Sequence, residues 1–426
     1  MSTRFQAPRG TQDVLPEMQP YWHSVLDAAR EVARLYGFRR IDTPVFELAA
    51  VFEKGSGDTT DIVEKEMYTF TDRGDEHLAL TPEATPAICR AYLEHGMASV
   101  PQPVRLYTTH QMFRYDRPQK GRYRQHTQFD CEVLGSTDAL VDAEVIELLW
   151  RLFERLGLKN LEVRLGSIDD PGPRKAYIER LKDYYRPHFS ELCDDSKRRF
   201  ERNPLRLLDS KDERDRPFKE GAPKLVDCLS QEAARHHAIV QEALTAARIP
   251  FRIDPLLVRG LDYYNRTVFE VVPTDDERAQ GTLGGGGRYD GLMELLGGPP
   301  TGGMGFGSGI ERIILEMQKA GIIIGESAGA EVFVVHRTEA GLGAVFGLAG
   351  RLRAAGLAVV LGESGRSLKS QLRSANSSGA RFAVIIGDEE LASGSAVVKD
   401  LRSEGEQAVV PLEALSLDLF SRLRPG

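Results

Sequence analysis

The stretch RLYTTHQMFRYDRPQKGRYRQHTQFDCEVLG (residues 105–135) carries the clearest indication of the fold. Its two ends, RLYTTHQMFR and RQHTQFDCEVLG, have the composition of β-strands, and they flank a loop that contains Pro118 and Gly121. This arrangement predicts an antiparallel hairpin. One acid, Asp116, lies near its tip among five basic residues: Arg114, Arg117, Lys120, Arg122 and Arg124. A solvated charged tip and a hairpin that presents arginine to an anionic ligand or to RNA phosphates both fit this composition.

Two glycine-rich stretches follow later in the chain, LGGGGRYDG (283–291) and TGGMGFGSGIERIIL (301–315). Neither has the lysine of a phosphate-binding P-loop, and neither gives the G-x-G-x-x-G spacing of a dinucleotide-binding turn. Tight turns or bulges are the plain interpretation of such clusters. The second stretch runs into an apolar helix that contains Arg312, so a glycine-lined passage beside a fixed cation for phosphate is the functional interpretation.

Two more stretches combine polar groups with the start of a regular element. LVRGLDYYNRTVFEV (257–271) places an arginine and paired tyrosines before a strand predicted at 268–272, which fits either a packed corner or a polar substrate site. LALTPEATPAICRAYLEHG (78–96) predicts a strand, a turn and a helix. Thr81 is a candidate N-cap with Pro82 at the first helical position and Glu83 in the first turn, although Glu83 could instead hold an ammonium group.

The rest of the chain predicts a divided architecture. Apolar stripes at 20–37 and 139–156 predict amphipathic helices, each closed by a glycine, and 161–165 alternates as a strand. Residues 170–250 are rich in charge and predict a mostly helical insertion. After a Gly/Ala/Ser-containing segment near 326, strands at 331–335, 358–361 and 381–387 alternate with helices at about 340–355 and 367–378. This alternation predicts a small α/β domain with a mainly parallel sheet.

Composition excludes several classes of protein. A chain of 426 residues favours two or three domains, and a net charge of −8 argues against a protein held on DNA by a general basic field. Four dispersed cysteines, a polar N-terminus and no apolar stretch of about 20 residues predict a cytoplasmic protein with no membrane segment. His236 and His237 lack the partners of a metal motif, so no metal site is expected, and no motif nominates a serine or cysteine nucleophile.

In this order, these stretches resemble the histidyl-tRNA synthetase family of class II aminoacyl-tRNA synthetases over essentially the whole chain. PRGTQD (8–13) and YGFRRIDTPVFE (36–47) are similar to motif 1, the dimer-forming segment; 113–128 is similar to motif 2 and 303–315 to motif 3. RGLDYYNRTVFE (259–270) and GGGGRYDGL (284–292) resemble two peptides peculiar to the histidine enzymes. Residues 366–390 resemble part of the family's anticodon-binding domain.

The resemblance implies an α+β catalytic domain at 1–325, with an antiparallel sheet flanked by helices, a mostly helical insertion at about 170–250, and an α/β anticodon-binding domain at 326–426. It implies a homodimer that joins histidine to ATP as histidyl-adenylate and transfers it to the 3′ end of tRNA(His). Mg²⁺ would arrive with ATP, no tightly bound cofactor is implied, and neither DNA nor a membrane would be a partner.

The resemblance also implies residue roles. Arg114 would hold the ATP α-phosphate, Arg312 the γ-phosphate, and Arg259 would lie between the α-phosphate and the histidine carboxylate, so that Arg114 and Arg259 both adjoin histidine. The amino acid would be recognised by Glu83, Thr85 and Gln128 at the α-amino group and by Glu132 and Tyr264 at the imidazole, with Tyr263 and Tyr289 lining the pocket. Arg117 and Gln119 would meet the tRNA acceptor end. Asp116 stands where motif 2 usually has glutamate, so its contact with adenine would be direct or through water.

A related non-enzymatic protein is the alternative. The regulatory subunit of ATP phosphoribosyltransferase resembles the same catalytic domain, has eroded motifs and typically lacks the C-terminal domain. This chain keeps Arg114, Arg259 and Arg312 together with the terminal α/β segment, which favours the enzyme.

Overall fold

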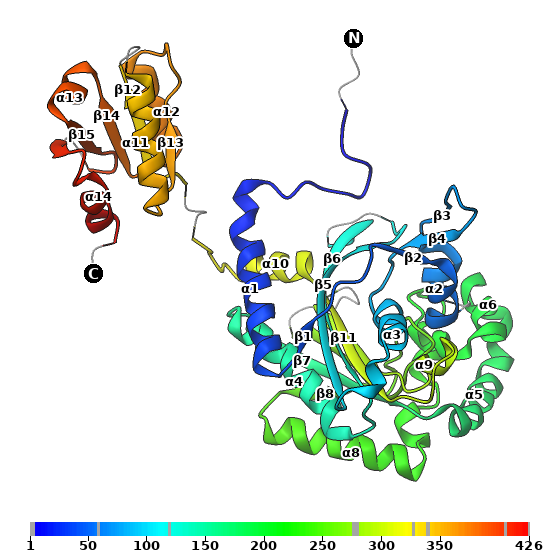
Figure 1. Ribbon diagram of the computed structural model, residues 1–426. Coiled ribbons are helices and arrows are strands. Elements are labelled where there is room, and N and C mark those ends of the chain that lie inside the picture. The colour runs from blue at the N-terminus through cyan, green and yellow to red at the C-terminus, as the bar shows by residue number, and fades with distance from the viewer. Residues whose placement is uncertain are drawn as a thin grey trace. The chain divides into compact units, whose positions relative to one another are not determined.

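The computed structural model describes residues 5–57, 60–117, 121–274, 281–325, 329–337, 341–403 and 407–424. The chain divides into two compact units, Met1–Ile324 and Gly325–Gly426, each with its own hydrophobic core (Figure 1). Among the described residues, no helix combines the length and the apolar character needed to cross a bilayer.

The first unit is built on an eight-stranded sheet in the order β1-β5-β6-β11-β10-β9-β7-β8. Its six inner strands pair antiparallel, and the short strands β1 and β8 join the edges in parallel. Strands β5 and β6 form an antiparallel hairpin, as the opening stretch predicts. The strands are β1 (Arg39–Arg40), β5 (Val104–Phe113), β6 (Gln125–Leu134), β7 (Leu161–Ile168), β8 (Phe251–Ile253), β9 (Asn265–Pro273), β10 (Gly284–Arg288) and β11 (Gly303–Gly309).

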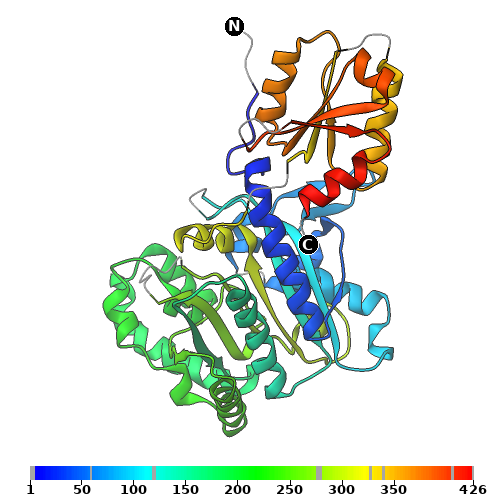
Figure 2. The ribbon, with the colours of Figure 1, turned by 90° about the vertical axis from the view of Figure 1, so that its left-hand side faces the viewer.

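Amphipathic helices cover one face of this sheet. Their apolar stripes share one core with alternate strand residues such as Phe129, Cys131 and Val133 of β6. Figure 2 shows α1 running across this side of the strands. The helices are α1 (Gln19–Leu35), α4 (Ala139–Arg155), α8 (Gln231–Ala246) and α10 (Ile310–Lys319), and the first two lie close to the stripes predicted from the sequence. Because side chains alternate along a strand, the residues between these core positions face the opposite side.

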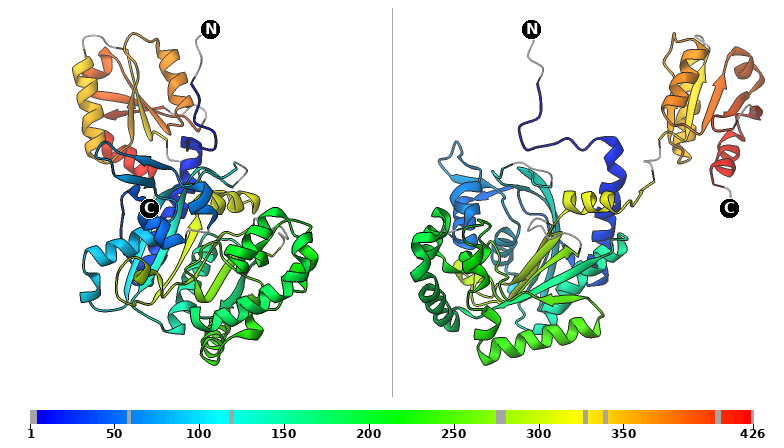
Figure 3. Two further views of the ribbon diagram at one scale, coloured as in Figure 1. Left: turned by 90° about the vertical axis from the view of Figure 1, so that its right-hand side faces the viewer. Right: turned by 180° about the vertical axis from the view of Figure 1, so that it is seen from behind.

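The opposite face of the sheet carries α3 (Thr85–Glu94), α9 (Leu292–Leu295) and the insertion. The insertion is mostly helical, as predicted, with α5 (Pro171–Tyr185), α6 (Asp194–Arg202) and α7 (Arg216–Glu220) leading to α8. In Figure 3 its green helices lie beside the blue α2 (Ala49–Ser56). Ion pairs from Arg206 and Arg199 to Asp61, at 3.3 and 3.7 Å, and from Arg202 to Glu64 connect the insertion to the segment after α2.

A small sheet stands next to α2, in the order β2-β4-β3. It consists of β2 (Phe46–Leu48), β4 (His77–Leu80) and β3 (Thr69–Thr71), all paired antiparallel. Several of its apolar side chains are exposed, namely Phe46, Leu48 and Phe70, with Val45 just before β2.

The tight-turn interpretation of the glycine clusters is wrong: 284–288 and 303–309 are strands β10 and β11 in the middle of the large sheet. The other interpretation, a glycine-lined passage into the helix that carries Arg312, is confirmed, because β11 runs directly into α10. The capping interpretation of the segment before α3 is wrong. Thr81 does not cap a helix, because α3 begins at Thr85 after Ala84. The turn before α3 is instead held by tertiary contacts, since Thr81 donates to the backbone oxygen of Pro44 at 3.2 Å and Glu83 is buried against Ser56 and Tyr263.

The second unit is a five-stranded sheet in the order β13-β12-β14-β15-β16. The first three strands are parallel, as predicted, but β15 and β16 add an antiparallel hairpin, so the sheet is mixed. The strands are β12 (Val332–His336), β13 (Val359–Leu361), β14 (Phe382–Ile386), β15 (Ser395–Asp400) and β16 (Gln407–Pro411). The helices are α11 (Leu342–Ala354), α12 (Leu368–Ser377), α13 (Asp388–Ser393) and α14 (Leu415–Leu423).

Candidate active site

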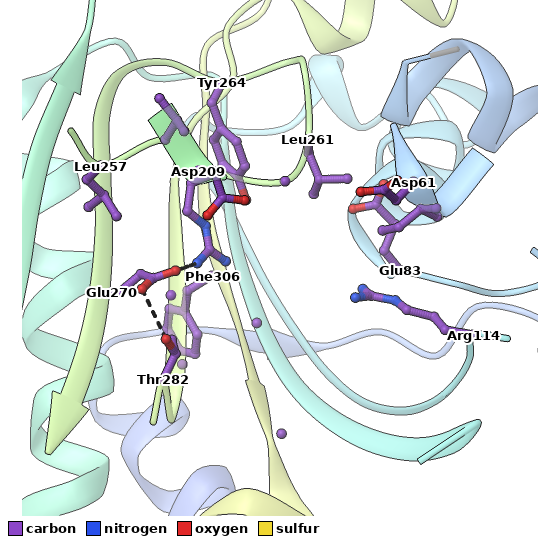
Figure 4. A pocket seen from close by; sticks show the side chains of 18 of the residues that line it. Asp61, Glu83, Arg114, Asp209, Leu257, Leu261, Tyr264, Glu270, Thr282 and Phe306 are labelled. Carbon is purple, nitrogen blue, oxygen red and sulfur yellow. Dashed lines mark hydrogen bonds and ion pairs between the residues drawn. The ribbon is translucent and has the colours of Figure 1, made fainter. Parts of the chain in front are cut away.

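A cavity of about 750 Å³ opens on the sheet face that the α1–α4 layer leaves free. Its floor is formed by β6, β10 and β11, and its walls by the start of α3, the segment after β5, the loop before β9 and the insertion. Figure 4 shows Arg114 and Glu83 on one wall, with Tyr264 and Glu270 across the cavity.

Most of the residues singled out from the sequence meet in this cavity, although they come from segments more than 200 positions apart. The lining includes Glu83, Thr85, Arg114, Asp116, Gln128, Arg259, Tyr263, Tyr264, Tyr289 and Arg312. Glu132 lies directly behind the lining and bonds to two of its members. Arg117 is exposed and is not part of the lining, and Gln119 lies outside the described residues.

Two buried glutamates accept hydrogen bonds from cavity side chains. Glu132, 1% exposed, accepts from Thr85 Oγ1 at 2.6 Å and from the Tyr289 hydroxyl. Burial, which outweighs these two donors, raises the pKa of Glu132 to about 8. Glu83 accepts from Ser56 and, at 2.9 Å, from the Tyr263 hydroxyl, and burial raises its pKa as well.

Seven of the described arginines line the cavity, and three of them, Arg114, Arg259 and Arg312, come from the stretches singled out in the sequence. Arg114 follows β5 and donates through Nε to the Pro82 oxygen at 2.7 Å. Arg312, on α10, donates to the backbone oxygens of Gly121 and Thr282 at 3.0 and 2.9 Å. Burial, followed by the charges of Arg122 and Arg114, lowers the pKa of Arg312. Concentrated positive charge of this kind suits a polyphosphate.

Arg259 is held in the loop before β9. Its guanidinium pairs with Glu270 of β9, and Glu270 also accepts from Thr282 Oγ1 at 3.0 Å (Figure 4). The buried Nε of Arg259 has no hydrogen-bond partner in the described part of the chain. The side chain is therefore fixed by Glu270 within the cavity lining.

The glycines of β10 and β11 make room for the polar side chains. A Cβ at Gly305 would overlap Glu132 Oε2, and it would lie 2.6 Å from the Cys131 oxygen. A Cβ at Gly303 would come within 2.6 Å of the Tyr289 ring. The floor of the cavity is thus backbone, which allows Glu132 and Tyr289 to meet above it.

Asp116 lies at the outer end of this wall. Its carboxylate accepts from Arg122 at 3.1 Å and from the backbone N–H of Arg117 at 2.6 Å. These contacts stabilise the turn after β5, and they leave Asp116 within the cavity lining.

Sequence reasoning assigned no role to several polar residues of the lining, among them Asp130, Glu270 and His126. Asp130 could have been found from the two-residue period that it shares with Gln128 and Glu132 on β6. His126 precedes Gln128 by the same interval, and burial, then the charges of Arg114 and Arg312, lower its pKa to about 3. No cluster of three or more His, Cys, Asp or Glu in the described ranges is arranged to hold a metal ion.

The architecture and the site together define a class of protein. An antiparallel sheet flanked by helices, with arginines and carboxylates around a cavity on one face, is the catalytic arrangement of class II aminoacyl-tRNA synthetases. The family model described as histidyl-tRNA synthetase matches residues 10–313, and the model described as anticodon binding domain matches residues 331–417. The chain belongs to the histidyl-tRNA synthetase family.

Proteins named histidine–tRNA ligase are similar along the whole chain. One from Dehalococcoides mccartyi is 50% identical over 419 residues, covering 98% of this chain and 100% of that protein. One from Desulforamulus reducens is 46% identical, covering 97% of this chain and 99% of that protein. The crystal structure of apo histidyl-tRNA synthetase from S. aureus is similar with a TM-score of 0.82 and 34% identity, covering 98% and 100% of the two chains. The similarity therefore includes both units.

Proposed function

We propose that this chain activates histidine with ATP, forming histidyl-adenylate and pyrophosphate, and then transfers the histidyl group to the 3′ end of tRNA(His). The observation that carries this proposal is the pairing, in one cavity, of a buried glutamate site with three inward-facing arginines. The glutamates suit an amino acid with a polar ring, and the arginines suit the phosphates of ATP.

In the first step, a carboxylate oxygen of histidine attacks the α-phosphorus of ATP and pyrophosphate leaves. Arg114 is proposed to hold the α-phosphate and Arg312 the γ-phosphate. Arg259 would stabilise the negative charge that builds up on the α-phosphate, and its partner Glu270 fixes its position. This task needs a permanent cation and no proton transfer, which suits a guanidinium. Mg²⁺ would be carried on the phosphates of ATP, because this ion usually binds through substrate phosphates and water.

Histidine recognition is proposed to use both ends of the amino acid. Glu83, Thr85 and Gln128 would bind the α-amino group. Glu132 and Tyr264 would meet the two ring nitrogens, with Tyr263 and Tyr289 forming the walls. A buried site that hydrogen-bonds both nitrogens rejects apolar side chains, because its own polar groups would be left unpaired.

In the second step, a hydroxyl at the 3′ end of tRNA attacks the histidyl carbonyl, and AMP leaves. Arg117 and Gln119 are proposed to meet the acceptor end, and the exposed position of Arg117 supports this role. The match of 331–417 to an anticodon binding domain supports anticodon recognition by the second unit. We propose that Asp116 contacts the adenine of ATP directly or through water.

The first test is ATP–pyrophosphate exchange. Purified protein is expected to incorporate labelled pyrophosphate into ATP only when histidine is present, because the α-phosphate is attacked by the bound amino acid. Glutamine and asparagine serve as control substrates. A folded sample that shows no exchange with histidine would favour the non-catalytic regulatory alternative.

A second prediction separates the two units. A chain ending at Gly325 retains Ile322 and Ile324, which pack on the first core, and Ile322 O, which accepts from the Tyr21 hydroxyl at 2.9 Å. This chain is expected to keep exchange within about threefold of the full chain, while kcat/KM for tRNA charging falls at least tenfold, about 1.4 kcal/mol. Equal charging by the two chains would contradict the proposed role of the second unit.

We also propose that the chain forms a homodimer and acts in the cytoplasm. The exposed apolar side chains of the small sheet, Val45, Phe46, Leu48 and Phe70, support a dimer contact, because they lie in or near the segment that resembles motif 1. The cytoplasm is where ribosomes consume the charged tRNA.

A further inference from the structure

Asp130 occupies the floor of the cavity between two residues already given roles. On β6 it stands two positions from Gln128 and two from Glu132, so the three side chains face the same side of the sheet. Its strand neighbours are Thr108 on β5 and Gly307 on β11. Asp130 is 4% exposed, yet it belongs to the cavity lining. Asp130 is therefore almost fully buried, and it contributes to the cavity lining.

The charge of Asp130 is not matched within the described chain. Its Oδ2 atom is buried and has no hydrogen-bond partner there, and no described cation forms an ion pair with it. Glu83 and Glu132, by contrast, each accept two side-chain hydrogen bonds. Oδ1 faces Gly307, where a Cβ would lie only 2.7 Å away, so the neighbouring strand leaves space for the carboxylate without binding it. An unpaired buried carboxylate costs free energy, which indicates that a ligand completes the site.

The chemistry of the proposed substrates decides which group that ligand supplies. ATP and tRNA are polyanions, which Asp130, Glu83 and Glu132 would repel. Histidine carries a group that is cationic at neutral pH, its α-ammonium group. Burial, then the charge of Glu132, raises the pKa of Asp130, and the charge of Arg114 lowers it. An ammonium placed among these groups would offset the like charges that now oppose one another.

We propose that Asp130 binds the α-ammonium group of histidine from the floor of the cavity, together with Glu83. This inference rests on the proposed function, because it needs histidine as the substrate. It adds Asp130 to the amino-acid site, between Gln128 and Glu132.

The test is Asp130→Asn, which keeps the shape of the side chain and removes its charge. Binding of three probes is measured by calorimetry: histidine, histidinol, and imidazolepropionate, which lacks the ammonium group. Histidinol and imidazolepropionate are also tested as inhibitors of histidine-dependent exchange. We expect Asp130→Asn to weaken the binding of histidine and of histidinol at least tenfold. The affinity for imidazolepropionate should change by less than twofold. The KM for ATP should stay within twofold. Asp27→Asn, on an exposed ion pair of α1, is the matched control and should change none of these values.

Thermal unfolding separates a binding role from a structural one. Because the variant removes an unmatched buried charge, its free protein should melt at the same or a higher temperature. If Asp130 were needed for packing, its replacement would lower the melting temperature. If Asp130→Asn does not fold, Asp130→Ser, which is smaller and still polar, is measured in the same way, and failure of both variants to fold would assign Asp130 a structural role.

The outcomes separate this inference from the proposed function. If the parent protein shows no histidine-dependent exchange, the proposed function fails first. If the parent is active, three results for Asp130→Asn would show that the assignment of Asp130 is wrong. The variant could bind histidine with normal affinity, lose the same affinity for all three probes, or show a KM for ATP raised more than twofold.

Discussion

Replacement of Arg259 by alanine is expected to slow histidyl-adenylate formation at least 100-fold, which corresponds to about 2.7 kcal/mol of barrier. Glu270 holds the Arg259 guanidinium in the cavity lining, where we propose that it stabilises the negative charge that develops on the α-phosphate. When one preorganised donor to a developing oxyanion is lost, the reaction rate commonly falls by about 10²–10³-fold. Single-turnover kinetics of adenylate formation, with ATP and histidine both saturating, measure the effect on the chemical step.

The control for this variant is Arg252→Ala. Arg252 also pairs with a glutamate, Glu162, at 3.0 Å, but it lies on β8 outside the cavity and is exposed. The Arg252→Ala variant should form histidyl-adenylate at a rate within about twofold of the parent. An Arg259→Ala rate within tenfold of the parent, in protein that melts normally, would contradict the proposed role.

Gly305→Ala is expected to abolish measurable exchange at the histidine concentrations that saturate the parent, with a fall in kcat/KM for histidine of at least 100-fold. The added Cβ would overlap the Glu132 carboxylate, and it has no room to retreat because the Cys131 oxygen lies 2.6 Å away. Glu132 would have to leave its bonds with Thr85 and Tyr289. Steady-state exchange over a range of histidine concentrations measures the loss.

Gly291→Ala is the matched control. Gly291 has φ −85°, which any residue adopts, and its Cβ would meet nothing within 4 Å. The Gly291→Ala variant should have the same kcat/KM for histidine in the exchange reaction as the parent. If Gly305→Ala keeps the parent's kcat/KM for histidine, the space between β11 and Glu132 does not define the amino-acid site.

The fold could be predicted where a local pattern determines the structure. The hairpin β5–β6, the amphipathic helices α1 and α4 and the start of the second unit follow from alternation, helical spacing and glycine stops. Strands β10 and β11 could not be predicted in this way, because glycine disfavours a strand by itself. They form strands because their neighbours supply the hydrogen bonds and because the side chains of Glu132 and Tyr289 fill the space above them.

The candidate site shows the same division. The residue types of Arg114, Arg259 and Arg312 suggest phosphate binding, and the resemblance to a family assigned them roles. Their convergence in one cavity depends on the sheet order, which pairs β6 with β11 across some 170 positions of sequence. The first-turn interpretation of Glu83, one of the two that the sequence left open, is wrong for a related reason. A capping pattern is local, whereas the contacts with Ser56 and Tyr263 that hold Glu83 outside the helix come from distant segments.

The sheet order also has a consequence for synthesis of the protein. Of the eight strands described in the large sheet, β10 and β11 are the last to leave the ribosome, yet they lie at its centre. Until they are made, a nascent chain carries β6 and β9 as two unprotected edges, which are prone to pair with other chains. Closure by β11 and β10 covers both edges and, in the same event, lays the glycine floor of the cavity. A growing chain therefore cannot gain its active site before its aggregation-prone edges are sealed.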